Sequence, residues 1–261
     1  MVSQGAIVGL ACAALISLVA PIIAYFVCRG RMALPGRNIA IGAGVFVLFV
    51  LVLEGAMHWY FLSHNPVTSA WLRAHTWGFI AYGAGAAALY EETGRYVAMR
   101  LFVSRVGEPG TAVSYGLGHG GAESILVGTL GQTQAMIMAL LLNAGLLGAL
   151  LGGRLPHAAL LKLQAALTKI DLPLALMGGM ERVWALMIQI GCSLLVWRAV
   201  ARKDLRWLAA ALLAHFSIDS VAGAAQRGLL TIQTTEAVVT AIGLVLLVFY
   251  LIRLPRRPLA G

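Results

Sequence analysis

The chain has 261 residues, of which 60% are hydrophobic and only 11% are charged. Soluble domains carry about 25% charged residues, and the apolar runs here repeatedly exceed the ~18 residues that indicate a membrane-spanning helix. The composition therefore excludes a soluble domain and predicts an all-α, polytopic bundle of transmembrane helices. The net charge of +9 does not indicate a nucleic-acid partner, because the basic residues lie in short loops between apolar runs, as orientation signals do.

The cysteine pattern excludes further classes of protein. The three cysteines, Cys12, Cys28 and Cys192, all lie in apolar segments. An odd count without a C-x-x-C spacing argues against a disulfide framework or a zinc finger. The first apolar run lacks a basic segment before it and is too long for a cleaved signal, so we expect a retained helix.

Hydropathy predicts seven spans, in chain order 5–28, 39–62, 76–103, 111–150, 174–199, 206–225 and 234–253. The fourth is long enough to be either one kinked helix or a hairpin that turns near Gly131–Gln134. Loop charge favours the single helix, because the hairpin would leave about nine basic residues facing about eight across the membrane. Seven spans place the amino terminus outside and the carboxyl terminus in the cytoplasm.

With seven spans the basic residues separate clearly between the two sides. The cytoplasmic side receives Arg29, Arg31, Arg37, Arg100, Arg105, Arg198, Arg202, Lys203, Arg206, Arg253, Arg256 and Arg257. The outside receives Arg73, Arg154, Lys162, Lys169 and Arg227. Cytoplasmic arginines of this kind also bind anionic lipid. We expect one integral membrane domain over residues 1–261, in a bacterial inner membrane, with an amphipathic helix at about 156–172 on the outer surface.

Three polar clusters interrupt the apolar spans: Glu91-Glu92-Thr-Gly-Arg95, His119-Gly-Gly-Ala-Glu123 and His215-Phe-Ser-Ile-Asp219. Ionisable groups at membrane depth are costly and usually mark function. Counted along the helices, all three clusters lie ~12–20 Å from the cytoplasmic ends of their spans. Because they reach one layer from different helices, the sequence predicts a single shared site.

Spacing within the clusters indicates how the side chains combine. His119 and Glu123 are four residues apart, as are His215 and Asp219, so each pair shares one helix face. Arg95 follows the two glutamates by one turn and holds a carboxylate ionised. Adjacent helical residues point about 100° apart, so one glutamate is the base and the other its partner. The glycines around His119 allow close helix approach.

A second polar group lies ~24–30 Å from the cytoplasmic ends. It consists of Glu54 and His58 on the second span and Glu181 and Arg182 on the fifth. This depth separates it from the first layer. We interpret it as a salt-bridged brace between helices, because buried ion pairs often serve only to specify packing.

The run Glu91-Glu92-x-x-Arg95, the GLGHGGAE stretch at 116–123, the Glu181-Arg182 pair and His215-x-x-x-Asp219 resemble the YhfC family of intramembrane proteases. That family is similar to the CAAX prenyl proteases, the bacterial PrsW proteases and the anterior-pharynx-defective subunit of γ-secretase. The resemblance covers the second to the sixth span in order.

The resemblance implies a glutamic-type intramembrane endopeptidase that cleaves a membrane-embedded or membrane-proximal protein or peptide. Glu91 or Glu92 would then activate water, and His119 and His215 would orient the water or stabilise the oxyanion. Asp219 occupies the place of an Asn in prenyl proteases. Arg95, Glu123, Glu181 and Arg182 would support this group. The prenyl-protease motif Phe-x-x-x-His is here His119-x-x-x-Glu123, and some members of the group are not catalytic.

Three alternatives accompany this hypothesis. A zinc ion could be held by the histidines and carboxylates His119, Glu123, His215 and Asp219. No HExxH motif is present and an arginine lies one turn from the glutamates, so no cofactor is favoured. The same groups could form the relay of a proton- or ion-coupled transporter, or belong to a catalytically inactive scaffold. No convincing internal repeat supports the transporter.

Overall fold

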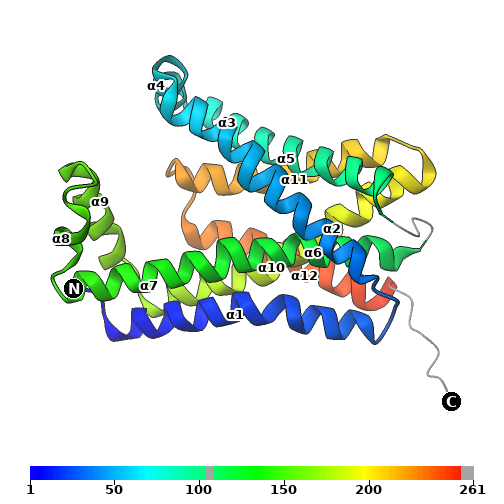
Figure 1. Ribbon diagram of the computed structural model, residues 1–261, viewed down its shortest axis with the longest axis horizontal. Coiled ribbons are helices and arrows are strands. Elements are labelled where there is room, and N and C mark those ends of the chain that lie inside the picture. The colour runs from blue at the N-terminus through cyan, green and yellow to red at the C-terminus, as the bar shows by residue number, and fades with distance from the viewer. Residues whose placement is uncertain (104–107, 254–261) are drawn as a thin grey trace. The chain divides into compact units, whose positions relative to one another are not determined.

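A computed structural model describes residues 1–103 and 108–253 of the chain. Every regular element in these residues is helical (Figure 1). Their order is α1 (Gln4–Arg29), α2 (Gly36–Val45), η1 (Phe46–Glu54), α3 (Gly55–Trp59), η2 (Tyr60–His64), α4 (Pro66–Ala74), α5 (Thr76–Leu101), α6 (Pro109–Glu123), η3 (Ser124–Thr129), α7 (Leu130–Asn143), α8 (Leu147–Leu151), α9 (His157–Thr168), α10 (Leu172–Arg202), α11 (Arg206–Gln226) and α12 (Ile232–Arg253). The η elements are π-helical segments that continue neighbouring α-helices.

Within residues 1–103 and 108–253, six long helices are apolar enough to cross a membrane: Gln4–Arg29, Gly36–His64, Pro109–Asn143, Leu172–Arg202, Arg206–Gln226 and Ile232–Tyr250. This confirms an all-α integral membrane protein. The 26-residue α5 is as long as α1, but it carries the polar cluster of Glu91, Glu92 and Arg95. Seven spans and the sidedness of the termini stay predictions. The basic residues Arg105, Arg256 and Arg257 lie outside the described residues.

The fourth predicted span is one helical run rather than a hairpin. It continues from Pro109 to Asn143 through η3, with α7 passing through Gly131–Gln134. The predicted end at residue 150 is wrong, because Gly145 adopts a positive φ of 73°. The Gly145 N–H bonds the Leu142 carbonyl and the Leu146 N–H bonds the Leu141 carbonyl. This is a Schellman-type helix end, which the permissive backbone of glycine allows.

The chain divides into two compact units. Unit 1 comprises Met1–Ile22 and Glu123–Val183, and unit 2 comprises Ile23–Ala122 and Trp184–Gly261. A single domain over the whole chain stays a prediction.

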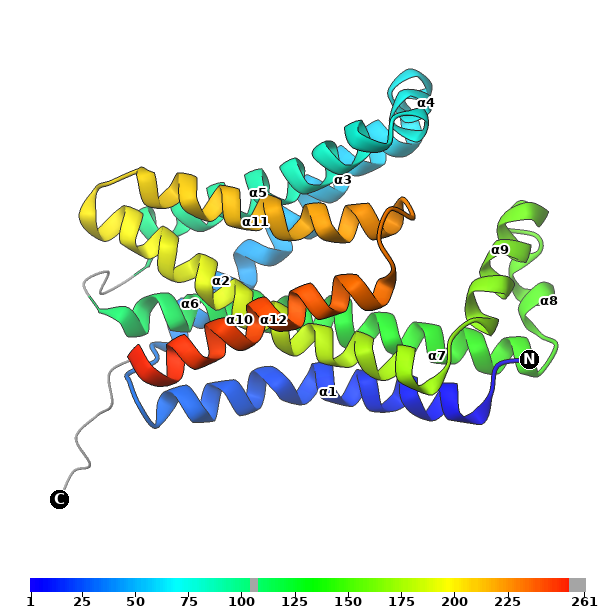
Figure 2. The ribbon, with the colours of Figure 1, turned by 180° about the vertical axis from the view of Figure 1, so that it is seen from behind.

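In unit 1, α7 lies beside the first part of α1 (Figures 1 and 2). The expected helix near 156–172 is α9, whose Leu160 and Leu167 are buried with Ala139 of α7 in one core cluster. The apolar face of α9 therefore packs on protein within this unit. Its place at the membrane surface stays a prediction.

In unit 2, α5 packs most extensively against α11, and the two helices run side by side in both views (Figures 1 and 2). The π-helical η1 covers another side of α5, where Phe49 lies against the Cα of Gly94. Helix α5 is therefore enclosed at the level of its acidic pair.

Glycines of α6 allow the close approach predicted from the sequence. Gly118 lies directly against the backbone of Ile39 in α2, and Gly116 and Gly120 face Ile190 and Gln189 of α10. A Cβ at Gly118 would come within 2.8 Å of the Ile39 Cα. These contacts fix α6 between α2 and α10 and thereby place His119.

We predict that Gly118→Ala lowers the free energy of unfolding by about 1–3 kcal/mol, the usual cost of overpacking. The measurement is thermal or denaturant unfolding of the purified protein in detergent. Gly83→Ala in α5 is the matched control, because nothing lies within 4 Å of a Cβ there. Equal stability of the two variants would contradict this packing.

Candidate active site

Helix α5 carries the central charges of unit 2. Glu92 and Arg95 are fully buried and Glu91 is 6% exposed. The Arg95 guanidinium lies one turn beyond the glutamates, with its Nη2 3.7 Å from Glu91 Oε2 and its Nε 3.5 Å from Glu92 Oε2. A buried charge needs a paired partner, and here one arginine serves two carboxylates.

His119 of α6 reaches the acidic pair from a second helix. Its Nε2 lies 2.9 Å from Glu91 Oε2, within hydrogen-bond distance. Tyr115, one turn earlier on α6, stacks on the imidazole, and Phe46 meets it edge-on. The ring is fully buried, so its orientation is fixed by aromatic packing.

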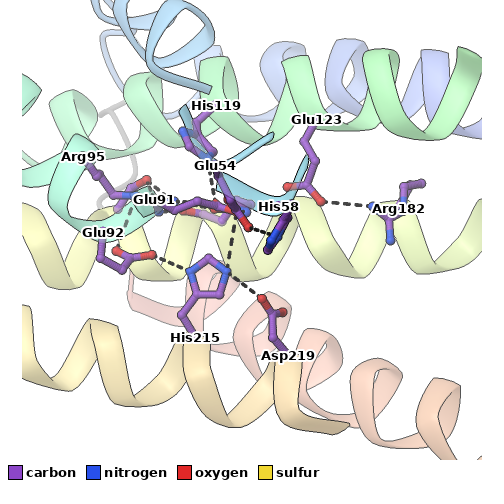
Figure 3. Close-up of polar contacts among 12 residues, drawn as sticks. Glu54, His58, Glu91, Glu92, Arg95, His119, Glu123, Arg182, His215 and Asp219 are labelled. Carbon is purple, nitrogen blue, oxygen red and sulfur yellow. Dashed lines mark hydrogen bonds and ion pairs between the residues drawn. The ribbon is translucent and has the colours of Figure 1, made fainter. Parts of the chain in front are cut away.

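His215 of α11 lies among three carboxylates (Figure 3). Its Nδ1 lies 2.7 Å from Glu92 Oε1. Its Nε2 lies 3.4 Å from Asp219 Oδ2 and 3.7 Å from Glu91 Oε1. The Asp219 side chain is 34% exposed whereas those of His215 and the glutamates are 8% exposed or less. Asp219 is therefore the most accessible member of this cluster.

Two residues of α10 complete the cluster without any sequence motif. Arg95 Nη1 donates to the Gln189 carbonyl at 2.8 Å and to Ser193 Oγ at 3.0 Å. Gln189 Nε2 donates to Glu91 Oε2 at 2.9 Å. The available signal was the four-residue spacing of two polar side chains in an apolar run, which places them on one helix face.

The structure thus gathers most of the predicted site in unit 2. Glu91, Glu92, Arg95, His119, His215 and Asp219 form one connected group, and their catalytic roles stay predictions. Glu123, Glu181 and Arg182 belong to unit 1. There Arg182 Nη1 donates to Glu123 Oε1 at 3.0 Å, and its Nη2 bonds Glu181.

The outer polar group matches the predicted brace in part: the ion pair of Arg182 with Glu123 joins α10 to α6, whereas Glu54 and His58 pair within one helix. Glu54 Oε1 lies 3.1 Å from Nε2 of His58, one turn later in the same run of helix. The contact of this pair with another helix is a hydrogen bond of 2.9 Å between His58 Nδ1 and the hydroxyl of Tyr82 on α5. The sequence did not single out Tyr82 as a partner, because a tyrosine in a span is usually interpreted as an interface anchor.

Several buried polar atoms of the cluster have no hydrogen-bond partner. Among the described residues, seven buried side-chain atoms are of this kind, and four lie here: Tyr115 Oη, His119 Nδ1, and Glu92 Oε2 with Arg95 Nε, which face each other as an ion pair at 3.5 Å. Buried polar groups in native proteins are almost always satisfied by protein, water or a ligand. Because Glu92 Oε2 and Arg95 Nε face each other, Tyr115 Oη and His119 Nδ1 are the two atoms here that a water molecule would satisfy.

The donor chemistry also fits a metal ion. Ligand atoms of Glu92, Cys192 and His215 lie within 4.8 Å of one another, and all three residues are buried. Oxygen, sulfur and nitrogen donors suit zinc, and three protein ligands leave a fourth position for water. The sequence favoured no metal, and of the four residues it offered as ligands if one were present, only His215 belongs to this group. Cys192 carried no signal, because it has no C-x-x-C partner.

Comparison with known proteins gives one consistent result. The chain is 33% identical over 258 residues to the "Uncharacterized membrane protein YhfC" of Bacillus subtilis (strain 168), covering 98% of this chain and 99% of that protein. No solved structure matches the chain. The family model of the "YhfC intramembrane metalloprotease" matches residues 16–252, a range that includes every residue of the cluster in α5, α6, α10 and α11. The chain therefore belongs to the YhfC family of intramembrane metalloproteases.

Proposed function

We propose that this protein is an intramembrane endopeptidase in which Glu91 activates the water that attacks a peptide bond. One observation carries this proposal. The buried Glu91 carboxylate is contacted by histidines from two other helices and lies beside the fully buried Arg95. Hydrolysis needs a base, a donor for the developing oxyanion and a proton for the leaving amine. The group contains side chains for all three.

The two glutamates have different surroundings, which assigns them different roles. Glu91 is contacted by Nε2 of both His119 and His215. Glu92 is fully buried and lies against His215 Nδ1 and Arg95 Nε. Glu92 therefore orients the imidazole, as a carboxylate commonly does for a catalytic histidine. Glu91 is left as the base.

The chemical steps follow from these positions. Glu91 takes a proton from water, and the resulting hydroxide adds to the scissile carbonyl carbon. The Nε2–H of His215 donates to the oxyanion that forms, because the Nε2–H of His119 is already bonded to Glu91. When the C–N bond breaks, the proton held by Glu91 passes to the leaving amine, so the carboxylate is regenerated. Asp219 holds His215 from the more accessible side.

The family description implies a metal, and the residues fit zinc. Glu92, Cys192 and His215 would hold it. A bound zinc would polarise the scissile carbonyl and make water more acidic. Glu91 would remain beside this group as the base, because it is not part of the donor set. Zinc and a glutamate base are therefore compatible in one centre.

The substrate class follows from the membrane location. The cluster lies on the long helices α5, α6, α10 and α11, so a substrate must reach it within or next to the bilayer. We propose a membrane-embedded or membrane-proximal peptide, cleaved in the cytoplasmic half of a bacterial inner membrane. The polar groups of the site would satisfy substrate backbone that the lipid cannot.

We predict that Glu91→Gln lowers the cleavage rate by about 10²–10⁴-fold, the usual contribution of a general base. The assay uses proteoliposomes that contain the purified chain and a panel of fluorescently labelled single-span peptides. Glu92→Gln and His215→Ala should also lose most activity. Glu54→Gln is the control, because it alters a buried glutamate that lies outside the cluster.

The same proteoliposomes test the transporter alternative. Full cleavage by Glu91→Gln would contradict the role of that carboxylate. Absence of any cleavage by the wild type, together with a proton flux that Glu91→Gln abolishes, would replace the peptidase by a transporter.

We also predict one equivalent of zinc per chain, which Cys192→Ala loses. The measurement is metal content by mass spectrometry, supported by cobalt substitution, where a thiolate ligand gives a charge-transfer absorption band. Cys28→Ala is the control, because Cys28 is not part of the donor set. Retention of metal and of the cobalt band by Cys192→Ala would contradict this assignment.

A further inference from the structure

Gln189 links the buried Arg95 to the proposed base Glu91. It lies on α10, is 5% exposed, and contacts both Arg95 and Glu91 through its amide. No motif marks it in the sequence. Its place between two ionised groups gives it a defined chemical task.

The direction of the hydrogen bonds fixes the orientation of this amide. A guanidinium has only donors, so the Gln189 Oε1 must accept from Arg95 Nη2. The Gln189 Nε2 therefore points the other way and donates to Glu91 Oε2 at 2.9 Å. Arg95 also donates to the main-chain carbonyl of Gln189, so backbone and side chain of this residue are held together.

These bonds make the two oxygens of Glu91 unequal. Oε2 accepts from Gln189 Nε2 and lies 2.9 Å from His119 Nε2. Oε1 faces His215 Nε2 at 3.7 Å, a distance beyond hydrogen-bond length. An oxygen already engaged by two donors is a poorer proton acceptor than one that is not. Oε1 is therefore the oxygen that can take a proton from water.

We propose that Gln189 is a positioning residue that engages Glu91 Oε2 and so presents Oε1 to the attacking water. This inference rests on the proposed function of Glu91 as the base. Glutamine suits the position because it combines an acceptor for Arg95 with a donor for Glu91. Glutamate has no donor, leucine has neither group, and asparagine is one methylene shorter.

Kinetics of Gln189→Leu test the role in the reaction. We expect kcat to fall about 10–100-fold while KM changes less than about twofold, because an interaction needed only for the chemical step lowers kcat. Gln189→Glu keeps the shape and the bond to Arg95 but places a third carboxylate beside Glu91, so it should lose kcat in the same way. If Gln189→Leu fails to fold, Gln189→Glu provides the test of kcat in its place. Gln132→Leu on α7 is the matched control and should keep wild-type values.

An infrared measurement tests the hydrogen bond without any activity. The spectrum of wild type minus that of Glu91→Gln isolates the Glu91 carboxylate stretch. The spectrum of Gln189→Leu minus that of the double variant Gln189→Leu, Glu91→Gln isolates the same stretch without the Gln189 hydrogen bond. We expect this band to be shifted from its position in the first difference spectrum. An unshifted band, or a fall in kcat/KM caused by KM alone, would overturn the inference. If the wild type cleaves nothing, the proposed function fails while the infrared band still decides the contact.

Discussion

The buried guanidinium of Arg95 is the constraint on which the rest of unit 2 depends. It is fully excluded from solvent, and a charge at membrane depth persists only when partners compensate it. Glu91 and Glu92 supply opposite charge from the same helix, and α10 supplies a carbonyl, a hydroxyl and an amide oxygen. The positions of α5 and α10 are therefore coupled through one side chain.

This coupling of α5 to α10 also positions the catalytic groups that we propose. Once Arg95 is held by α10, the glutamates beside it are fixed as well, and the histidines of α6 and α11 approach them from two further helices. Each histidine contacts a different glutamate most closely, so the acidic pair separates into a base and an orienting partner. The close glycine contacts of α6 bring His119 near enough for this arrangement.

The sequence was sufficient for the fold class and for the residues of this cluster on α5, α6 and α11. Charged and imidazole side chains are rare in apolar spans, and four-residue spacing placed them on common faces. It was not sufficient for Gln189, Ser193 and Cys192, because uncharged polar residues are frequent in membrane helices. Their importance depends on which face of α10 turns towards Arg95, and that is a property of packing.

The sequence was likewise not sufficient to predict which polar side chains pair across long sequence separations. Arg182 bonds Glu123, which lies 59 residues earlier, although spacing alone had assigned Glu123 to the His119 cluster. His58 likewise bonds Tyr82 on another helix. Local rules name the candidates, whereas the choice among partners is made by helix packing.

The coupling energy between Arg95 and Glu92 tests the central claim most directly. Unfolding of Arg95→Met, Glu92→Gln and the double variant in detergent gives this energy by a double-mutant cycle. We expect Arg95→Met alone to cost about 3–5 kcal/mol, because it leaves buried carboxylates without their cation. The double variant should then be more stable than the sum of the single effects by at least about 1 kcal/mol. Additive effects within about 0.5 kcal/mol would show that the two charges do not depend on each other and would contradict this account.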